Sequence, residues 1–427
     1  MNLLDDLRWR GLVHQTTDDA NISAWLAEKP RTVYAGFDPT ADSLHVGSLL
    51  PLMMLRRFQL AGHKPIAVVG GATGMIGDPS GKSQERNLLS KADLDHNVAG
   101  LREQMKQFLD FDEKSKNAAV MVNNFDWVGP FSYLEFLRDV GKNFPVNVML
   151  AKDSVKGRLN SDAGMSYTEF SYMLLQAFDF VYLYDKYNCE LQVGGSDQWG
   201  NITAGIDLGR RMRGAHLCGI TSPLLTKSDG TKMGKTETGT VWLSAKRTSP
   251  YQFYQYWIRT EDADVGKCLR MMTTLPHEEI ESLDEALQIN AAARLSQQRL
   301  AIELTRLVHG NEGLSAAQRA TEIFYGAEIS DLNDGQLAEI FADVPSQQLS
   351  RSVLKDVGGL PIVDALVASG LSKSKGDARR TAQQGGAYVN NRRIDGVDAR
   401  LTEADLASET VMVLRSGKKN YALLRFS

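Results

Sequence analysis

The chain has 427 residues, of which 43% are hydrophobic and 23% are charged, and its formal net charge is −4. This composition excludes a disordered, collagen-like or coiled-coil protein, and the length predicts two or three domains, each with its own core. The three cysteines lie too far apart in the sequence for a disulfide framework or a C-x-x-C zinc site, so we expect no structural metal.

Residues 1–13 carry four charged side chains and no apolar core, and the longest apolar run, 49–55, is far shorter than the roughly 20 residues of a spanning helix. We therefore expect a cytoplasmic protein without a membrane partner. Residues 352–427 hold 12 Lys plus Arg against 8 Asp plus Glu, whereas residues 1–351 are acidic. Because exposed charges are screened beyond about 8 Å at physiological salt, a polyanion can still bind the basic part.

The first part of the chain is predicted to be an α/β domain. Residues 33–235 alternate short apolar runs with helix-period segments, which is typical of βαβ units in a largely parallel sheet. Strands are expected at 32–37, 65–69 and 191–193, and a helix at 49–60.

The pattern changes at Ser249-Pro250, a helix N-cap followed by proline, and helices are expected up to residue 342, with ends at Gly310 and Gly326. Residues 343–351 have the polar, proline-containing composition of a linker. Beyond the linker we expect a small α+β domain, with two helices and two hairpins at 362–369, 374–384, 388–393 and 411–426.

Three segments have residues suited to binding polyphosphate. The glycine-rich segment 70–83 follows an expected strand but fits neither a Walker motif nor G-x-G-x-x-G, and it could equally form a tight turn. Residues 38–48 precede a helix N-terminus, where Thr40 and His45 can donate hydrogen bonds to an anion. The loop 227–236 carries two lysines three residues apart. Taken singly, a capped turn and a solvated basic loop are the plainer interpretations of the last two.

Three polar residues are spaced to share one helix face. Tyr172 and Gln176 are four residues apart and Asp179 lies three further along, so all three are predicted to project into one pocket. Asp179 stands between Phe178 and Phe180, which a helix with its polar face in solvent does not explain.

In combination, these motifs resemble the class I aminoacyl-tRNA synthetases. An H-x-G-x turn at 45–48, the run Gly-Gly-Ser-Asp-Gln-Trp-Gly-Asn at 194–201 and a K-M-G-K-T loop at 232–236 occur in that order. Tyr-Ala-Gly-Phe-Asp-Pro-Thr at 34–40 and Tyr-Met-Leu-Leu-Gln-Ala-Phe-Asp at 172–179 resemble the bacterial type of tyrosyl-tRNA synthetase, over essentially the whole chain. The resemblance implies a Rossmann-like catalytic domain, an α-helical anticodon-side domain, a linker and an S4-like RNA-binding domain, at 1–247, 248–342, 343–351 and 352–427.

The resemblance further implies a homodimeric ligase that joins L-tyrosine to tRNA(Tyr) by way of tyrosyl-adenylate, with ATP as a substrate accompanied by Mg²⁺. Because the attacking carboxylate is already a nucleophile, catalysis is positioning plus charge stabilisation. The implied contacts are Thr40, His45, Lys232 and Lys235 to the ATP phosphates, Tyr34 and Asp179 to the phenol, Asp78, Tyr172 and Gln176 to the ammonium group, Gln198 to the carboxylate, and Asp38, Gly47, Ser48 and Asp197 to other parts of ATP or the adenylate.

Two positions depart from the family pattern. Ser48 stands where His or Asn is common and has a shorter reach toward ATP, and Gly234 replaces the first Ser of K-M-S-K-S, as is usual in the tyrosyl branch.

The basic C-terminal part is expected to follow RNA phosphates, although a solvated charged helix is the alternative. Its candidate contacts are Lys373, Lys375, Arg379, Arg380, Arg392 and Arg393. Two other functions compete with tyrosine activation. Tryptophan activation is disfavoured because indole offers a single donor to the pair Tyr34 and Asp179. A non-catalytic RNA-binding protein on a decayed synthetase scaffold is disfavoured because both lysines, His45 and the tyrosine-pocket residues are retained.

Overall fold

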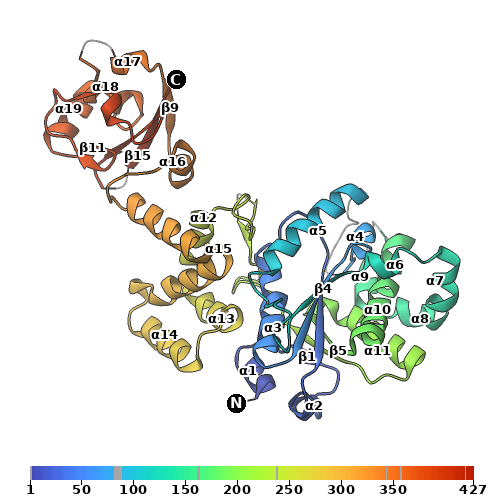
Figure 1. Cartoon of the computed structure of the whole chain (residues 1–427). Helices are drawn as coiled ribbons and strands as arrows, with labels where there is room; N and C mark the ends of the chain where they lie inside the picture. Colours follow the sequence, from blue (N-terminus) through green and yellow to red (C-terminus); the bar gives the residue numbers. More distant parts are fainter. Residues whose placement is uncertain are drawn as a thin grey trace. The chain divides into compact units, whose positions relative to one another are not determined.

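The computed structural model describes residues 2–80, 89–160, 164–236, 239–342, 344–355, 358–418 and 420–427, so the end of the glycine-rich segment, 81–83, lies outside the described residues. The chain forms two compact units (Figure 1). The first contains Met1–Thr248 and Trp257–Val308, and the second contains Ser249–Tyr256 and His309–Ser427. No helix among the described residues has the length and apolar character needed to cross a bilayer.

A six-stranded sheet forms the centre of the first unit, in the order β1-β6-β5-β2-β3-β4. All neighbouring strands are parallel except β1 and β6. The strands are β1 (Gln15–Thr16), β2 (Thr32–Phe37), β3 (Lys64–Val69), β4 (Val120–Asn123), β5 (Cys189–Gly195) and β6 (Cys218–Ser222). The chain builds from β2 to β4 on one side and then returns to β5 on the other. Such a reversal of strand order is where open α/β sheets bind ligands.

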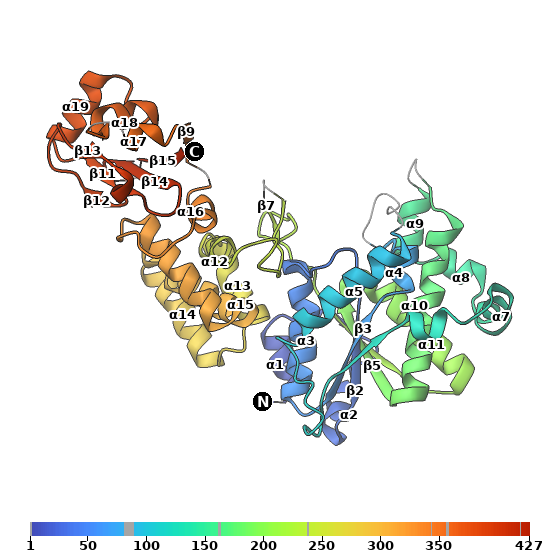
Figure 2. The same ribbon diagram turned by 45° about the horizontal axis from the view of Figure 1, so that its top comes forward.

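Helices cover both faces of this sheet. Helix α3 (Leu49–Leu60) lies on one face, and α10 (Tyr167–Tyr187) with α11 (Trp199–Arg213) lies on the other (Figures 1 and 2). The remaining helices wholly within this unit are α1 (Leu3–Trp9), α2 (Ile22–Glu28), α4 (Thr73–Ile76), α5 (Lys91–Met105), α6 (Phe125–Val128), α7 (Tyr133–Asp139), α8 (Val146–Leu150), α9 (Asp153–Leu159), α13 (Asp262–Met272) and α14 (His277–Ile289). The strands and the helix expected at 32–69 form at the predicted residues, to within one residue.

Helix α10 is fixed at its first turn by a cap and a buried ion pair. The Ser166 side chain accepts a hydrogen bond from the Glu169 N–H, and Asn188, with a left-handed φ of 52°, ends the helix. The Arg158 guanidinium binds the Glu169 carboxylate in a bidentate manner at 2.7 and 2.8 Å, and both side chains are buried. Because a buried carboxylate needs such a partner, this pair sets the position from which α10 presents its polar face.

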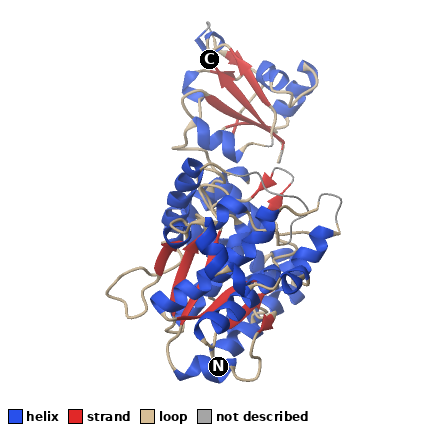
Figure 3. Cartoon of the chain, turned by 90° about the vertical axis from the view of Figure 1, so that its right-hand side faces the viewer, coloured by secondary structure: helices blue, strands red, loops and turns tan. Residues whose placement is uncertain are grey.

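The second unit is built around a five-stranded sheet in the order β12-β11-β14-β15-β9, antiparallel except for β15 and β9 (Figure 3). Its strands are β9 (Ser346–Leu349), β11 (Ala387–Val389), β12 (Arg392–Arg393), β14 (Val411–Ser416) and β15 (Asn420–Phe426). The short β10 (Leu360–Pro361) and β13 (Arg400–Leu401) pair beside it. Its helices are α16 (Asp334–Ile340), α17 (Ser352–Lys355), α18 (Ile362–Ala368) and α19 (Lys375–Gln383). Both expected hairpins form, with Asn390, Asn391 and Gly417 at positive φ in their turns.

Strands β14 and β15 are buried on both faces. Met412, Leu414 and Leu424 pack with α18 and α19, whereas Val411, Val413 and Leu423 pack against α16 and the end of α15 (Leu295–Phe324). The alternation has a period of two, as expected of a strand with opposite faces. Residues 309–342 therefore cover one face of the C-terminal sheet.

The compact units depart from the expected domain boundaries. The segment 248–342 is divided between the two units, and α12 (Pro250–Ile258) and α15 extend across the division. The division falls beside Gly310, where α15 has non-helical φ and ψ of 69° and −176°. Within the expected linker 343–351, Ser346–Leu349 form β9 of the C-terminal sheet, because their backbone completes its edge beside β15.

Candidate active site

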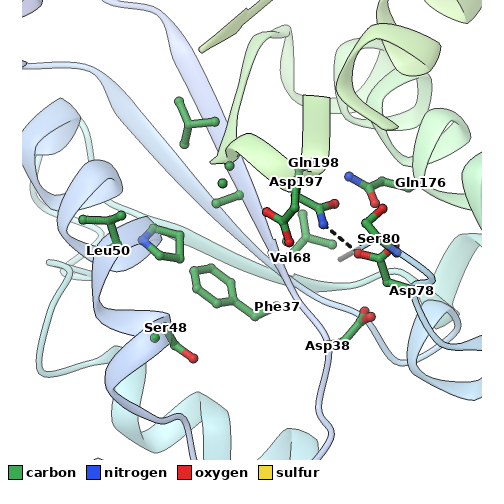
Figure 4. A pocket seen from close by; sticks show the side chains of 18 of the residues that line it. Phe37, Asp38, Ser48, Leu50, Val68, Asp78, Ser80, Gln176, Asp197 and Gln198 are labelled. Carbon is green, nitrogen blue, oxygen red and sulfur yellow. Dashed lines mark hydrogen bonds between the residues drawn. The ribbon is translucent and has the colours of Figure 1, made fainter. Parts of the chain in front are cut away.

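The carboxyl ends of β2 and β5 border a pocket of about 320 Å³ (Figure 4). Its walls come from β2 and the turn that follows, the glycine-rich segment, α10 and the turn after β5. The predicted site residues that line it are Tyr34, Asp38, Thr40, His45, Gly47, Ser48, Asp78, Tyr172, Gln176, Asp179, Asp197 and Gln198. Lys232 and Lys235, the remaining two of the predicted tyrosine and ATP contacts, are exposed on the loop 227–236 and do not line the pocket.

Asp179 is a buried acceptor in the pocket wall. The Trp127 indole N–H donates to Oδ1 at 2.8 Å, and the Asn124 amide donates to Oδ2 at 3.0 Å. Burial raises the pKa of Asp179 to about 7, although both hydrogen bonds act in the opposite direction. Nearby, the buried hydroxyl group of Tyr34 has no hydrogen-bond partner among the described residues. Burial, followed by the charge of Asp179, holds the pKa of Tyr34 well above its usual value, so this hydroxyl stays protonated.

A chain of hydrogen bonds connects Asp179 to Asp38 through Asn124 and Thr73. Asn124 also donates to the Thr73 hydroxyl at 3.0 Å, and Thr73 donates to Asp38 Oδ1 at 2.8 Å. The Tyr172 hydroxyl donates to Asp38 Oδ2 at 3.1 Å. The Ala72 N–H donates to the Asn124 carbonyl oxygen at 2.7 Å, which fixes the Asn124 amide with its N–H₂ toward Asp179 and Thr73.

Asp78 forms a second polar cluster at the pocket. Gln198 donates to Asp78 Oδ2 at 2.6 Å (Figure 4), and the Ser80 N–H donates to Oδ1 at 2.9 Å. Burial and the charge of Asp78 raise the pKa of Asp197, and Lys232 acts in the opposite direction. The charge of Lys232 therefore reaches the pocket electrostatically, although its side chain is exposed.

Several residues that line the pocket or support its wall were not predicted from the sequence. Thr73 and Asn124 connect carboxylates that lie far apart in the chain, and Trp127 holds Asp179. Gln192, on β5, lines the pocket with a buried amide oxygen that has no described hydrogen-bond partner. The only sequence signal for Asn124 and Trp127 is their place just after an apolar segment that forms β4.

The six candidate RNA contacts lie on the surface of the second unit, and three of them have acidic partners. Lys375 pairs with Asp364 at 2.7 Å and Arg380 with Asp377 at 3.8 Å, while Arg392 pairs with Glu328. No ion pair with a described residue is formed by Lys373, Arg379 and Arg393.

Two family models match this chain and together cover most of it. Residues 26–326 match the family model described as tRNA synthetases class I (W and Y), and residues 336–424 match a model described as the tyrosine–tRNA ligase SYY-like C-terminal domain. The fold is therefore that of a class I tRNA synthetase.

The relatives specify the family. A tyrosine–tRNA ligase of Rhodopirellula baltica is 60% identical over 99% of this chain and 96% of its own length, and one of Opitutus terrae is 52% identical over the full length of both. A C-terminally truncated mitochondrial tyrosyl-tRNA synthetase of Aspergillus nidulans has a TM-score of 0.68 at 32% identity, covering 76% of this chain and 94% of that one. The chain belongs to the tyrosine–tRNA ligase family.

Proposed function

We propose that the chain is a tyrosine–tRNA ligase, which activates L-tyrosine with ATP and transfers the tyrosyl group to the 3′ end of tRNA(Tyr). The observation that carries the choice of amino acid is the presence in one pocket of two buried groups, the Asp179 carboxylate and the Tyr34 hydroxyl, the latter without a hydrogen-bond partner among the described residues. A phenol satisfies both by donating to Asp179 and accepting from Tyr34. Phenylalanine would leave the buried Tyr34 hydroxyl without an acceptor, and the Asp179 carboxylate would keep only its hydrogen bonds from Asn124 and Trp127. Such rejection of an analogue that lacks a hydroxyl is the effect for which this enzyme family serves as a standard example.

The ammonium and carboxylate groups of tyrosine are assigned to the polar residues that surround Asp38 and Asp78. Asp78, Tyr172 and Gln176 would bind the ammonium group, and the Gln192 oxygen, which has no partner among the described residues, would be a further acceptor for it. Gln198 would turn from Asp78 to the substrate carboxylate, and Asp197 would bind the ribose. Asp38, which accepts from Tyr172 and Thr73, lies next to the position assigned to the adenylate.

Activation is an attack by the tyrosine carboxylate on the α-phosphate of ATP, with pyrophosphate as the leaving group. We assign phosphate contacts to Thr40 and His45 in the turn that opens α3, with Gly47 and Ser48 beside them. Lys232 and Lys235 would stabilise the charge that develops on pyrophosphate. The described residues contain no group of three or more potential metal ligands, and Mg²⁺ is assigned to the ATP phosphates, with which it would enter.

We assign tRNA binding to the second unit and catalysis to the first, and we infer that the enzyme acts in the cytoplasm, where its substrates are. The RNA face would comprise the six basic residues named above, with Lys373, Arg379 and Arg393 as its most available charges.

A homodimer is supported by an apolar surface on α7 to α10, which we call the α7–α10 patch. Its large hydrophobic side chains are between 41% and 75% exposed: Tyr133, Leu134, Val146, Val148, Leu150, Leu159 and Tyr167. The Tyr133 and Tyr167 hydroxyls lie 3.4 Å apart, so the ends of α7 and α10 adjoin. Exposed apolar patches of this kind mark interfaces, and we assign this one to a second copy of the chain.

Replacing Leu134 with aspartate is expected to convert the dimer to a monomer, because a charge would be buried without a partner in the apolar interface. The molar mass from sedimentation equilibrium measures this result. Leu60→Asp, which alters a side chain of 67% exposure on α3, is the control and should remain dimeric. A parent protein that is monomeric, or a Leu134→Asp variant that still dimerises, would contradict the assignment.

One assay tests the proposed function as a whole. Pyrophosphate exchange into ATP is measured with tyrosine, tryptophan and phenylalanine in turn, and only tyrosine is expected to support it. Exchange with tryptophan in place of tyrosine would disprove the assignment of the pocket, and exchange with none of the three would leave an RNA-binding function alone.

A further inference from the structure

The loop 227–236, which we call the lysine loop, contacts the turn at 45–48, which we call the His45 turn, and the contact is made by a glycine. A Cβ atom built on Gly234 would lie 2.9 Å from Val46 Cβ and 3.2 Å from its Cγ1. Gly234 also has a φ of 87°, which side chains rarely adopt. Val46 is fully buried at the start of the turn η1 (Val46–Ser48), so it cannot move aside easily. Only glycine fits this contact without a shift of the loop.

Backbone hydrogen bonds join the same two segments. The Val46 N–H donates to the Val241 carbonyl at 3.0 Å, and the Val241 N–H donates to the Gly234 carbonyl at 2.9 Å. The Leu243 N–H donates to the Leu44 carbonyl at 2.8 Å. Val241 thus lies between the loop and the turn and is bonded to both.

Lys232 and Lys235 flank two buried residues of the loop, Met233 and Gly234. Met233, which precedes Gly234, is buried, and its N–H donates to the Leu225 carbonyl at 3.0 Å. Lys232 and Lys235 stand on either side of this pair and are exposed. The position of both ammonium groups therefore depends on how closely residues 233 and 234 approach the His45 turn.

His45 is held from the same side. Its ring meets the Trp242 ring edge-on, with centroids 6.2 Å apart, and the Arg247 guanidinium lies over Trp242 while binding Asp42. The segment that bonds the loop to the turn thus also contacts the imidazole assigned to the ATP phosphates.

We propose that Gly234 is a positioning residue for adenylate formation: its missing side chain lets the lysine loop dock on Val46, which aligns Lys232 and Lys235 with His45 around one polyphosphate. This inference rests on the proposed function. It gives a steric reason for glycine at this position of the loop. A side chain at residue 234 would hold the loop away from the turn and leave the tyrosine pocket unchanged.

The test compares Gly234→Ala with Gly230→Ala. Gly230 lies in the same loop with a φ of 83°, but a Cβ there would have no atom within 4 Å, so the control reports backbone strain without the contact. In pyrophosphate exchange, Gly234→Ala is expected to lower kcat/KM for ATP by about a hundredfold, because small displacements of catalytic groups cost that much. Gly230→Ala should lower it far less. Equilibrium binding of tyrosine without ATP should match the parent in both variants, which also verifies that the pocket is folded.

A double-mutant cycle separates positioning from general damage. In a background of Lys232→Ala and Lys235→Ala, the alanine at 234 should cause little further loss, because the groups that it displaces are gone. Equal losses in the two glycine variants, a full additional loss in the lysine-free background, or weakened tyrosine binding in Gly234→Ala would overturn the inference. A parent protein that shows no exchange with tyrosine would instead overturn the proposed function.

Discussion

Replacing Asp179 with asparagine is expected to lower kcat/KM for tyrosine in pyrophosphate exchange by about 10²- to 10⁴-fold, equivalent to about 3–5 kcal/mol. The asparagine cannot replace the carboxylate, because its amide N–H₂ must face either the Asn124 amide or the Trp127 indole N–H, and both are donors. Asn124 cannot turn its oxygen inward without losing the hydrogen bond from the Ala72 N–H. The variant therefore loses its contact to the phenol and leaves a buried donor facing a donor.

The KM for ATP should change little, because Asp179 lies at the phenol end of the pocket. Asp185→Asn is the matched control: Asp185 is on the same helix, but its side chain is 40% exposed and pairs with Arg213 at the surface. An Asp179→Asn variant that activates tyrosine as fast as the parent would remove Asp179 from the pocket.

The pH profile gives an independent measure of the same group. Burial raises the pKa of Asp179 to about 7, and the phenol needs the ionised carboxylate as an acceptor. In the parent, kcat/KM for tyrosine should therefore fall as the pH drops below about 7, and this step should be missing from Asp179→Asn.

The raised pKa of Asp179 makes the stability of the folded protein fall as the pH rises, whereas the activity rises with pH. The pKa of the folded state lies above the ordinary value of 3.8. The stability contribution of this carboxyl is therefore fully present below about pH 3.8 and is lost as the pH rises through about 7. The melting temperature of the parent, relative to Asp179→Asn, should fall over this range.

Charge reversal on the RNA face is expected to lower kcat/KM for tRNA about a hundredfold or more in aminoacylation, and to leave tyrosine-dependent pyrophosphate exchange within twofold. The variant combines Lys373→Glu, Arg379→Glu and Arg393→Glu, which change the basic residues without an ion pair to a described residue. If each contacts a phosphate, the slope of log affinity against log salt should become shallower by about 2–3.

The control keeps the charges, as Lys373→Arg, Arg379→Lys and Arg393→Lys, and should charge tRNA nearly as well as the parent. An unchanged salt slope in the charge-reversed variant would show that RNA binds elsewhere. Deleting residues 352–427 is a poorer test, because it would uncover Ile323, Leu337 and Phe341, which the C-terminal sheet covers.

Local spacing predicted the parts of the site that lie within one element. Tyr172, Gln176 and Asp179 share the pocket because a helix repeats every three to four residues, and the residues after β2 and β5 meet because parallel strands end at one edge. The partners of Asp179 could not be found in this way. Asn124 and Trp127 lie 55 and 52 residues from it in sequence, and only the assembled sheet brings them together.

The extent of the second compact unit could not be predicted from composition, for a different reason. The composition of residues 343–351 suggested a linker, but composition does not reveal which segment covers a sheet. A signal was present in the runs 411–414 and 421–424. Every residue in them is apolar, with no alternation of apolar and polar side chains, and this pattern indicates strands buried on both faces. One face needed a cover from outside residues 352–427, and 309–342 provide it.

The two-sided burial of β14 and β15 also sets the smallest piece of this chain that can be transplanted. A graft that begins at residue 343 would carry a sheet with one bare apolar face, prone to aggregation, and would leave Phe341 and its neighbours bare on the donor. A graft that begins next to Gly310 would carry both the sheet and its cover. Chimaeras that exchange the C-terminal unit between members of the family should therefore be joined there, inside α15.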